Sequence, residues 1–240
     1  MPEHADPYID PETGVLRNKA GIQSKAALDV FERMRVQRRL EQGIPTGNFD
    51  LKHLKAIHHH LFQDVYDWAG ELRTVNISKG GSAFQPLQFL NQGVDYVHKE
   101  IVKSHFLRGL PPSLFAERAA AIIGDLNYAH PFREGNGRTQ FAFLTQLAEK
   151  AGYSIDVDRV PNQEWIEASK KAFDNDSSMM AKLINEMIVE QPGMDVEIDS
   201  GVRSGGSKSL LEHLNEEQNS PPAQLPGIRS RKRDGRDPTD

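Results

Sequence analysis

Apolar side chains recur at helical spacing through most of the chain, which predicts a bundle of amphipathic helices. Ser24 can cap a helix that runs to about Gln42. Its expected apolar face carries Ala27, Val30, Phe31 and Met34. Asp50 can cap a second helix that ends near Val65. Further helices are predicted at about Leu87–Phe106, Pro111–Ala129, Thr139–Ala151, 162–173 and 177–190.

One segment breaks the helical pattern. Arg73 to Ile77 alternates as a strand does, and Lys79 to Ser82 has the composition of a turn. We therefore expect one short β-hairpin as the only β-structure. The predicted fold class is mostly α.

The composition changes near Pro192. Residues 1–192 are predicted to form one folded domain. Residues 193–240 are rich in Gly, Ser, Pro and charge, which predicts a mostly disordered tail with at most a short helix over Lys208–Glu217. The basic cluster Arg229–Arg233 suits a secretion or docking signal or a nucleic-acid contact, but we favour a solvated tail.

The composition of the chain excludes several classes of function. The 240 residues include 29 basic and 34 acidic side chains, so the net charge of −5 gives no general reason to bind nucleic acid or a membrane. The chain has no cysteine, which excludes disulfides and thiolate metal sites. No apolar stretch approaches the roughly 20 residues of a membrane span. The polar N-terminus predicts no signal peptide.

The segment His130–Arg138 concentrates chemistry in nine residues, His-Pro-Phe-Arg-Glu-Gly-Asn-Gly-Arg, directly before an apolar helix. The first turn of a helix binds anions readily. Gly135 and Gly137 let the backbone approach a phosphate closely, and Asn136 can donate its side-chain amide to it. Arg138 can bind a second phosphate, and Phe132 is expected to point into the core.

Two residues of this segment can perform or assist a reaction. Glu134 is an oxygen ligand suited to Mg²⁺, and His130 is a natural general base near neutral pH. We interpret the segment as a nucleotide site in which His130 deprotonates an incoming hydroxyl. The alternative is a glycine-rich capping loop whose charges face solvent.

These residues resemble the signature of the Fic (Fic/Doc) family, His-Pro-Phe-x-(Asp/Glu)-Gly-Asn-Gly-Arg-x-x-Arg, and the match is complete through Arg138. The segment Trp68–Gly81 is similar to the hairpin "flap" of Fic proteins. The resemblance covers roughly residues 8–190 and implies a Fic-like helical bundle with a β-hairpin flap.

The resemblance implies a protein adenylyltransferase that uses ATP and Mg²⁺, because family members move AMP from ATP onto a hydroxyl side chain of a target protein. It gives His130 the role of general base and Glu134 that of metal ligand. The nucleotide-binding residues would be Arg133, Gly135, Asn136, Gly137 and Arg138. The target protein would pair with the flap, which comprises Thr74, Val75, Asn76, Ile77, Ser78, Lys79 and Gly80.

The chain departs from the signature at its last position, where Phe141 replaces an arginine. Phe141 cannot donate to a terminal phosphate, and a lost charge-assisted bond costs about 1.5–3 kcal/mol. The family's inhibitory Ser/Thr-x-x-x-Glu-Gly/Asn motif is not matched, because Ser113 and Glu117 are followed by Arg118. The chain therefore resembles the class that is inhibited by a separate small antitoxin, whose glutamate would need another anchor, such as Arg138.

Three functions stay open at this point. The leading hypothesis is a toxin of a bacterial toxin–antitoxin pair, acting in the cytoplasm, with DNA gyrase and topoisomerase IV as candidate targets; translocation into a host cell stays open. The second keeps the fold but uses another donor, for UMP or phosphocholine transfer. The third is a non-enzymatic binding or effector protein.

Other residues are assigned to packing. The run His58–His60 lacks the spacing of a helical metal site, so we expect one ring in the core and the others toward solvent. Trp68 and Phe84 flank the flap and are interpreted as packing residues. Lys79 could touch a phosphate, although an exposed turn lysine is the favoured interpretation.

Overall fold

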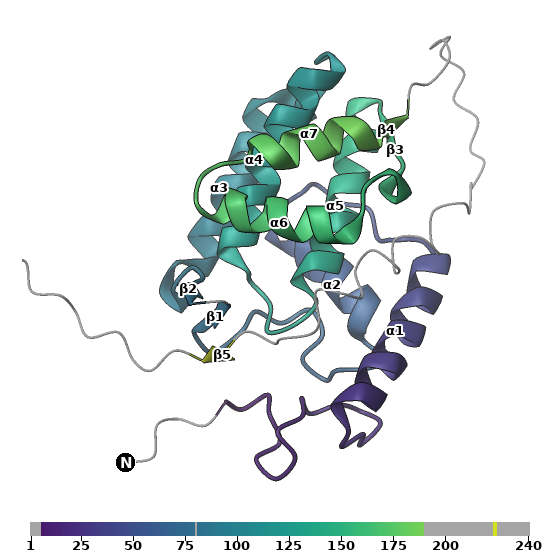
Figure 1. Ribbon diagram of the computed structural model, residues 1–240, viewed down its shortest axis with the longest axis vertical. Helices are drawn as coiled ribbons and strands as arrows, with labels where there is room; N and C mark the ends of the chain where they lie inside the picture. The colour runs from purple at the N-terminus through teal and green to yellow at the C-terminus, as the bar shows by residue number, and fades with distance from the viewer. Residues whose placement is uncertain (1–5, 80, 190–222, 225–240) are drawn as a thin grey trace, which may run out of the picture.

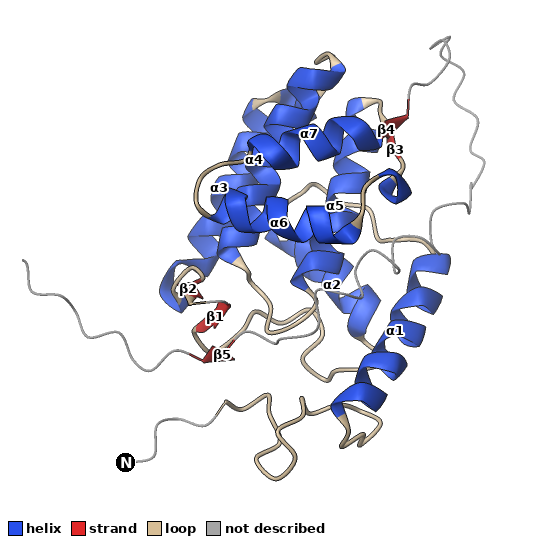
Figure 2. Cartoon of the chain, in the orientation of Figure 1, coloured by secondary structure: helices blue, strands red, loops and turns tan. Residues whose placement is uncertain are grey.

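The computed structural model describes residues 6–79, 81–189 and 223–224. Helices dominate this part of the chain (Figures 1 and 2). The predicted mostly helical fold is therefore confirmed. The main helices are α1 (Lys25–Glu41), α2 (Leu51–Phe62), α3 (Leu90–Lys103), α4 (Pro112–Ala129), α5 (Asn136–Ala151), α6 (Asn162–Phe173) and α7 (Ser178–Met187).

Helix α4 is the buried helix of the bundle, as the sequence predicts. It packs against α3, α5, α6 and α7. Small side chains such as Ala116, Ala119 and Ala120 are at most 1% exposed, and they let the neighbouring helices approach closely. Pro112 stands in the first turn, where its missing N–H costs no helical hydrogen bond. The segment from Ser113 to Glu117 lies in this helix.

Helix α5 carries the apolar residues that join the two halves of the bundle. Phe141, Phe143, Leu144 and Leu147 are all at most 1% exposed. Phe141 packs against Trp165 of α6, with ring centroids 4.4 Å apart. Phe141 is therefore a core residue that contacts α6.

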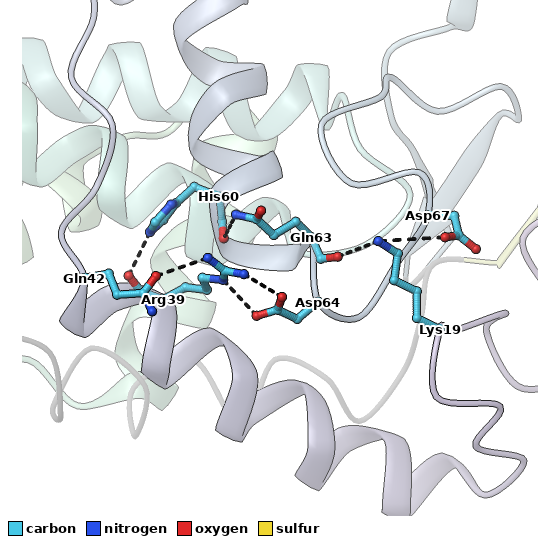
Figure 3. Close-up of polar contacts among 7 residues, drawn as sticks. All are labelled: Lys19, Arg39, Gln42, His60, Gln63, Asp64 and Asp67. Atoms are coloured by element: carbon cyan, nitrogen blue, oxygen red, sulfur yellow. Dashed lines mark hydrogen bonds and ion pairs between the residues drawn. The ribbon is translucent and has the colours of Figure 1, made fainter.

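Helices α1 and α2 pack against each other, and α2 also packs against α5. Figure 1 shows α1 at the lower right of the bundle. Ser24 and Asp50 cap them as predicted, by accepting from the backbone N–H of Ala27 and His53. Their C-terminal ends are joined by polar contacts, which Figure 3 shows. Arg39 of α1 donates to both carboxylate oxygens of Asp64, at 2.8 and 2.5 Å. His60 of α2 bonds to the Arg39 carbonyl at 2.8 Å.

The predicted apolar face of α1 is wrong. The buried positions are Leu28, Glu32, Val36 and Leu40, whereas Val30 and Met34 are 52% and 67% exposed. The apolar residues of α1 are spread around the helix, so their pattern alone does not select a face. The helix turns the carboxylate of Glu32 inward, where it meets an arginine of α5.

Several predicted boundaries shift by a few residues. Helix α2 ends at Phe62 rather than Val65, and α7 ends at Met187. The single helix expected over Leu87–Phe106 is divided into η1 (Leu87–Phe89), α3 and η2 (His105–Leu107). Phe106 takes a left-handed conformation in η2, with φ of 59°, which breaks the helix. Predicted boundaries for α4 and α6 agree with the structure to within one residue.

The flap hairpin exists, but its strands start later than predicted. Strand β1 (Ile77–Lys79) pairs antiparallel with β2 (Ser82–Ala83). Val75 and Ile77 pack with Tyr8 and Phe84 in a small apolar cluster that fixes the hairpin to the body.

The expectation that the flap would be the only β-structure is wrong. Strand β3 (Ser154–Ile155) pairs with β4 (Ile188–Val189), and Ile9 forms a β-bridge with Leu16. Strand β5 (Ala223–Gln224) pairs antiparallel with the other edge of β1, with Ile77 opposite Gln224 and Ser78 opposite Ala223. The flap edge therefore accepts a strand from the same chain.

The rest of the predicted tail lies outside the described residues. This holds for the Lys208–Glu217 helix, the Arg229–Arg233 cluster and the boundary at 192/193. The described helices include none with the length and apolar character that crossing a membrane requires.

Replacing Phe141 by alanine should destabilise the fold by about 3–5 kcal/mol, because it leaves a cavity between α5 and α6. Val30→Ala on the exposed face of α1 is the control and should change stability by about 0.5 kcal/mol or less. Denaturant unfolding of both variants measures this difference. Equal stabilities would show that Phe141 is not a core residue.

Candidate active site

The segment His130–Arg138 forms a tight loop between α4 and α5. Two left-handed residues shape it: His130, with φ of 43°, ends α4, and Gly135, with φ of 79°, precedes α5. A side chain at Gly135 would also collide with Phe62 of α2, since a Cβ there would lie 2.3 Å from that ring. Glycine is therefore required at 135 by both backbone conformation and space.

Asn136 closes the loop from inside. Its side chain accepts from the Phe132 N–H at 2.9 Å and donates to the Phe132 carbonyl at 2.8 Å. The Phe132 ring is 1% exposed and anchors the loop in the core, as predicted. In this conformation the Asn136 amide is engaged with the backbone, so its contact with a phosphate stays a prediction.

The His130 ring is held in one orientation at the cavity. Nδ1 lies 3.2 Å from the Asn127 carbonyl, which can only accept, so Nδ1 carries the proton and Nε2 keeps its lone pair. Phe84 of the flap stacks on the ring, with centroids 3.8 Å apart. Burial, with smaller contributions from Lys79 and Arg73, lowers the pKa of His130 to about 3. The imidazole is thus neutral at physiological pH, as a general base must be.

Arg73 joins the flap to the end of α4. Its guanidinium donates to the carbonyls of His130 at 2.8 Å, Val75 at 2.9 Å and Ala129 at 3.3 Å, and also to that of Gln85. Its backbone N–H donates to the Pro131 carbonyl at 2.9 Å. The side chain is 3% exposed, and burial lowers the pKa of Arg73 to about 10. One cation therefore positions both His130 and the base of the flap.

Beneath the loop lies a buried group of two acids, an arginine and a tyrosine. Arg138 lies 2.6 Å from Glu32 of α1 and 3.7 Å from Glu134, and its guanidinium stacks over the Phe62 ring. Tyr66 donates its hydroxyl to Glu32. Burial, together with Glu32, raises the pKa of Glu134, while Arg138 lowers it. The Glu134 carboxylate also accepts from the Gly135 N–H at 2.9 Å.

The side chain of Arg133 turns toward the N-terminal segment. Its Nε donates to Asp6 at 2.9 Å, and the residue is 1% exposed. This buried ion pair ties residue 6 to the loop. A nucleotide contact by Arg133 therefore stays a prediction.

A cavity of about 390 Å³ opens between the loop, the flap and α6. The loop contributes His130, Arg133, Glu134, Gly135, Asn136 and Gly137 to its lining, and Lys79 and Phe84 come from the flap. Helix α6 and its C-terminal end contribute Ile166, Ser169, Lys170, Phe173 and Asp174. The predicted catalytic, metal-binding and nucleotide-binding residues are thus gathered around one cavity, except that Arg138 is not in its lining. Of the predicted flap residues that the structure describes, only Lys79 lines the cavity.

The N-terminus of α5 opens on this cavity. Its N-cap, Gly135, has no side chain that can cap the helix, so the first backbone N–H groups are available to an anion. This is the arrangement that a phosphate group requires.

The predicted flap residues have two roles in the structure. The backbone N–H of Thr74 bonds to the Tyr8 hydroxyl at 3.0 Å, and the Asn76 side chain accepts from the Leu87 N–H at 3.1 Å, so both hold the flap in place. Ile77, Ser78 and Lys79 form the strand itself. Lys79 is partly buried at the cavity rather than an exposed turn residue. Gly80 lies outside the described residues.

Sequence reasoning missed the residues that support the loop from other elements, namely Glu32, His58, Tyr66 and Arg73. Arg73 was visible only as part of the flap resemblance. A glutamate on the interior face of an amphipathic helix is a signal that could have identified Glu32, had the face of α1 been assigned correctly.

Comparison with known proteins agrees with this geometry. Residues 48–148 match the Fic/DOC family. The probable protein adenylyltransferase y4lH of Sinorhizobium fredii is 36% identical over 184 residues, which cover 76% of this chain and 96% of y4lH. The chain belongs to the Fic/Doc family. The predictions of a Fic family member and of an enzyme of this class are confirmed.

Two further relatives extend the comparison. The protein adenylyltransferase VbhT of Bartonella schoenbuchensis is 41% identical over 212 residues, and the chain spans 44% of the length of VbhT. The crystal structure of a Fic domain from a Bartonella quintana effector, with bound ADP, superposes with a TM-score of 0.71 at 28% identity. It covers 77% of this chain and 95% of that Fic domain, so the Fic fold is shared over the bundle.

The Fic loop also fits a Mg²⁺ ion. The described residues hold no group of three or more acidic or histidine side chains that could bind a metal by themselves. Mg²⁺ commonly takes one or two carboxylates and completes its octahedron with substrate phosphates and water. Glu134 is one of the residues that line the cavity, and its carboxylate, which contacts Arg138 and the Gly135 N–H, would supply such a ligand.

Gly135→Ala should destabilise the protein strongly and abolish function, because the new methyl group meets Phe62 and the backbone is left-handed. Gly14→Ala is the matched control, since Gly14 also has a positive φ, of 69°, but open space around it. The control should cost only about 1–2 kcal/mol of backbone strain. Thermal unfolding compares the two, and equal losses would contradict the steric argument.

Two neutral histidines, His58 beneath the loop and His130 at the cavity, predict acid sensitivity. The pKa of His58, like that of His130, is lowered by burial to about 3. Unfolded histidine takes up a proton near pH 6.5, so the free energy of unfolding should fall as pH drops below 6.5, by about 1.4 kcal/mol per unit for each histidine.

Unfolding at pH 7, 6 and 5 tests this for wild type and His130→Ala. The variant should show a shallower fall because one such histidine is gone. Parallel curves would contradict the lowered pKa of His130.

Proposed function

We propose that this protein is an adenylyltransferase that moves AMP from ATP to a hydroxyl side chain of a target protein. The observation that carries the proposal is the neutral His130, with its Nε2 lone pair available, beside the uncapped N-terminus of α5. His130 Nε2 can accept a proton while the N–H groups at the start of α5 hold a phosphate. The adenylyltransferase relatives support the same reaction.

In the proposed reaction, His130 Nε2 takes the proton of the target hydroxyl. The oxygen attacks the α-phosphorus of ATP, a new P–O bond forms, and the bond to pyrophosphate breaks. The N–H groups at the start of α5 hold the transferred phosphate and stabilise its charge. Mg²⁺ on Glu134 would neutralise charge on the donor phosphates. Catalysis would rest on positioning and charge stabilisation.

In this chain the two arginine positions of the Fic signature do not supply a free cation for the terminal phosphates of the donor, so other cations must bind them. Phe141 is packed on Trp165, and Arg138 is paired with Glu32 under the loop. Lys79 and Lys170 line the cavity instead. This difference favours a second candidate function, in which the same loop transfers UMP or phosphocholine from another donor. A non-enzymatic role is less supported, because binding alone needs no base.

The flap is the proposed docking edge for the target. Strand β1 has β2 on one side and accepts β5 on the other, which supports strand addition as the mode of target binding. In this proposal a target segment takes the place of β5, and its hydroxyl reaches His130.

We propose a toxin role in a bacterial cytoplasm, with a small antitoxin as inhibitor and type II topoisomerase subunits as candidate targets. Likeness to Bartonella effector domains keeps translocation into a host cell open. Arg138 is a poor anchor for an antitoxin glutamate, since Glu32 already occupies it. Such an inhibitor would have to displace Glu32 or bind another cation.

His130→Ala should lower AMP transfer at least about 100-fold, the usual effect of losing a general base, while nucleotide binding is kept. The measurement is transfer of label from ATP labelled on the α-phosphate into proteins of a bacterial lysate with Mg²⁺. ATP labelled on the γ-phosphate is the control and should give no labelled band. Full transfer by the variant would refute the proposed role of His130.

Donor competition distinguishes the two candidate functions. Under the leading proposal, excess unlabelled ATP suppresses transfer, whereas UTP and CDP-choline do not. Suppression by UTP or CDP-choline but not by ATP would assign the reaction to the second candidate.

Removing the chain after Val189 should raise target labelling by about 2-fold to 10-fold, the equivalent of roughly one net hydrogen bond, because β5 no longer competes for the flap edge. A chain that ends at residue 228 keeps β5 and is the control. Labelling that is unchanged or lower in the shorter chain would contradict competition at this edge.

A further inference from the structure

His58 lies on the buried face of α2, directly beneath the Fic loop. Its side chain has no solvent exposure. Nδ1 accepts the Gly70 N–H at 2.7 Å, which leaves the ring proton on Nε2. Nε2 then donates to the Glu134 carbonyl at 3.0 Å. His58 therefore bridges Gly70, which precedes the flap, and Glu134 in the loop.

The same ring supports the loop through stacking. It lies nearly parallel to Phe132, with centroids 3.8 Å apart and planes 15° apart. Phe62, one turn further along α2, is 4.7 Å from the His58 ring and lies under Gly135 and Arg138. His58 and Phe62 thus form the floor on which the loop rests.

The neighbouring histidines point elsewhere. His59 bonds to the Ala69 carbonyl at 2.9 Å, and His60 bonds to the Arg39 carbonyl at 2.8 Å. Consecutive residues on a helix face different directions, so the three rings have different partners. Among them, only His58 contacts the loop, and His60 offers a matched control on the same helix.

We propose that His58 is a positioning residue for Glu134. By donating to the Glu134 carbonyl, it fixes the backbone of a residue that lines the cavity. It thereby sets the position of the carboxylate that would bind the Mg²⁺ accompanying the donor phosphates. This inference rests on the proposed function insofar as Glu134 is taken as the metal ligand.

The physical reason for this role is that a buried carbonyl oxygen requires a hydrogen-bond donor, and His58 provides one to Glu134. Without one, the Glu134 carbonyl loses its partner and the peptide turns toward water or another N–H. The carboxylate is attached to the same residue, so it moves with the peptide. A displacement of about 1 Å is enough to weaken a metal site or a reacting geometry substantially.

Two substitutions separate the two hydrogen bonds of His58. His58→Gln places its amide N–H near the position of Nε2 and keeps a donor for Glu134. His58→Asn places its oxygen near the position of Nδ1, so it keeps the acceptor for Gly70 but loses the donor to Glu134. Each variant loses one bond and the ring stack, so a purely structural role would affect both alike.

The first readout is ADP affinity by calorimetry with and without Mg²⁺, which does not depend on transfer. The quantity compared is the ratio of ADP affinity with Mg²⁺ to ADP affinity without it. In His58→Asn this ratio should be lower than in wild type by about 10-fold or more. In His58→Gln and His60→Asn it should stay within about 3-fold of the wild-type ratio. The second readout is the Mg²⁺ concentration that gives half-maximal transfer, which should rise only for His58→Asn.

Three outcomes are decisive. Equal Mg²⁺ dependence in His58→Asn and His58→Gln would overturn the proposal, and so would an equal loss in His60→Asn. A selective loss in His58→Asn supports it even if wild type transfers no AMP, in which case only the proposed reaction fails. Thermal unfolding is measured for every variant. If either His58 variant is unfolded, His58→Phe replaces it, because it keeps a ring against Phe132 but removes the donor to Glu134. His58→Phe must then lose the Mg²⁺ effect on ADP affinity, and a retained effect would overturn the proposal.

Discussion

The guanidinium of Arg73 is the contact on which the site depends most. It is a buried cation that satisfies its donors with carbonyl oxygens, two of which, Ala129 and His130, stand at the C-terminal end of α4. That end carries partial negative charge, which stabilises the cation. The remaining donors hold Val75 and Gln85 on either side of the flap hairpin. Arg73 therefore links the flap directly to His130, while the apolar cluster around Tyr8 holds the hairpin to the body of the domain.

The other contacts of the site depend on this link between the flap and the end of α4. The flap brings Phe84 onto the His130 ring, and Asn127 fixes the tautomer of that ring. On the other side, the loop rests on His58 and Phe62 of α2 and is closed by Asn136. A base, a helix N-terminus and a carboxylate thus face one cavity without any of them having to move for the cavity to form. Such prior organisation is what phosphoryl-transfer chemistry requires of a protein.

Local sequence signals predicted much of this arrangement. The Fic loop, the capping residues Ser24 and Asp50, and the helices α4, α5 and α6 follow from patterns within a short stretch of chain. The errors concern contacts between distant segments. The face of α1 was misassigned because its orientation is decided by Glu32 meeting Arg138 of α5, a pairing 106 residues away that no periodicity reveals. The β3–β4 and β1–β5 pairs are short and join distant segments, so no alternating pattern of apolar and polar residues predicts them.

The difference between local signals and long-range contacts also applies to individual site residues. Their chemical types could be assigned from the motif, but the direction of each side chain could not. Arg133 faces Asp6, Arg138 faces Glu32, and the Asn136 amide faces the backbone of Phe132. Asn136 and Arg138 were assigned to phosphates from their chemistry, and Arg133 was assigned to the nucleotide from the family resemblance. In the folded chain Arg138 and Asn136 hold the loop. Arg133 uses Nε for Asp6, lines the cavity and keeps a buried Nη1 without a hydrogen-bond partner.

The central claim is that His130 is a preformed, neutral base. Nitrogen NMR of the ¹⁵N-histidine-labelled protein tests it most directly, with the His130 signals assigned by their loss in a His130→Asn variant. The account predicts a proton on Nδ1, none on Nε2, and no titration between pH 8 and pH 5, because the pKa lies near 3. A proton on Nε2, or a pKa close to 6.5, would contradict it.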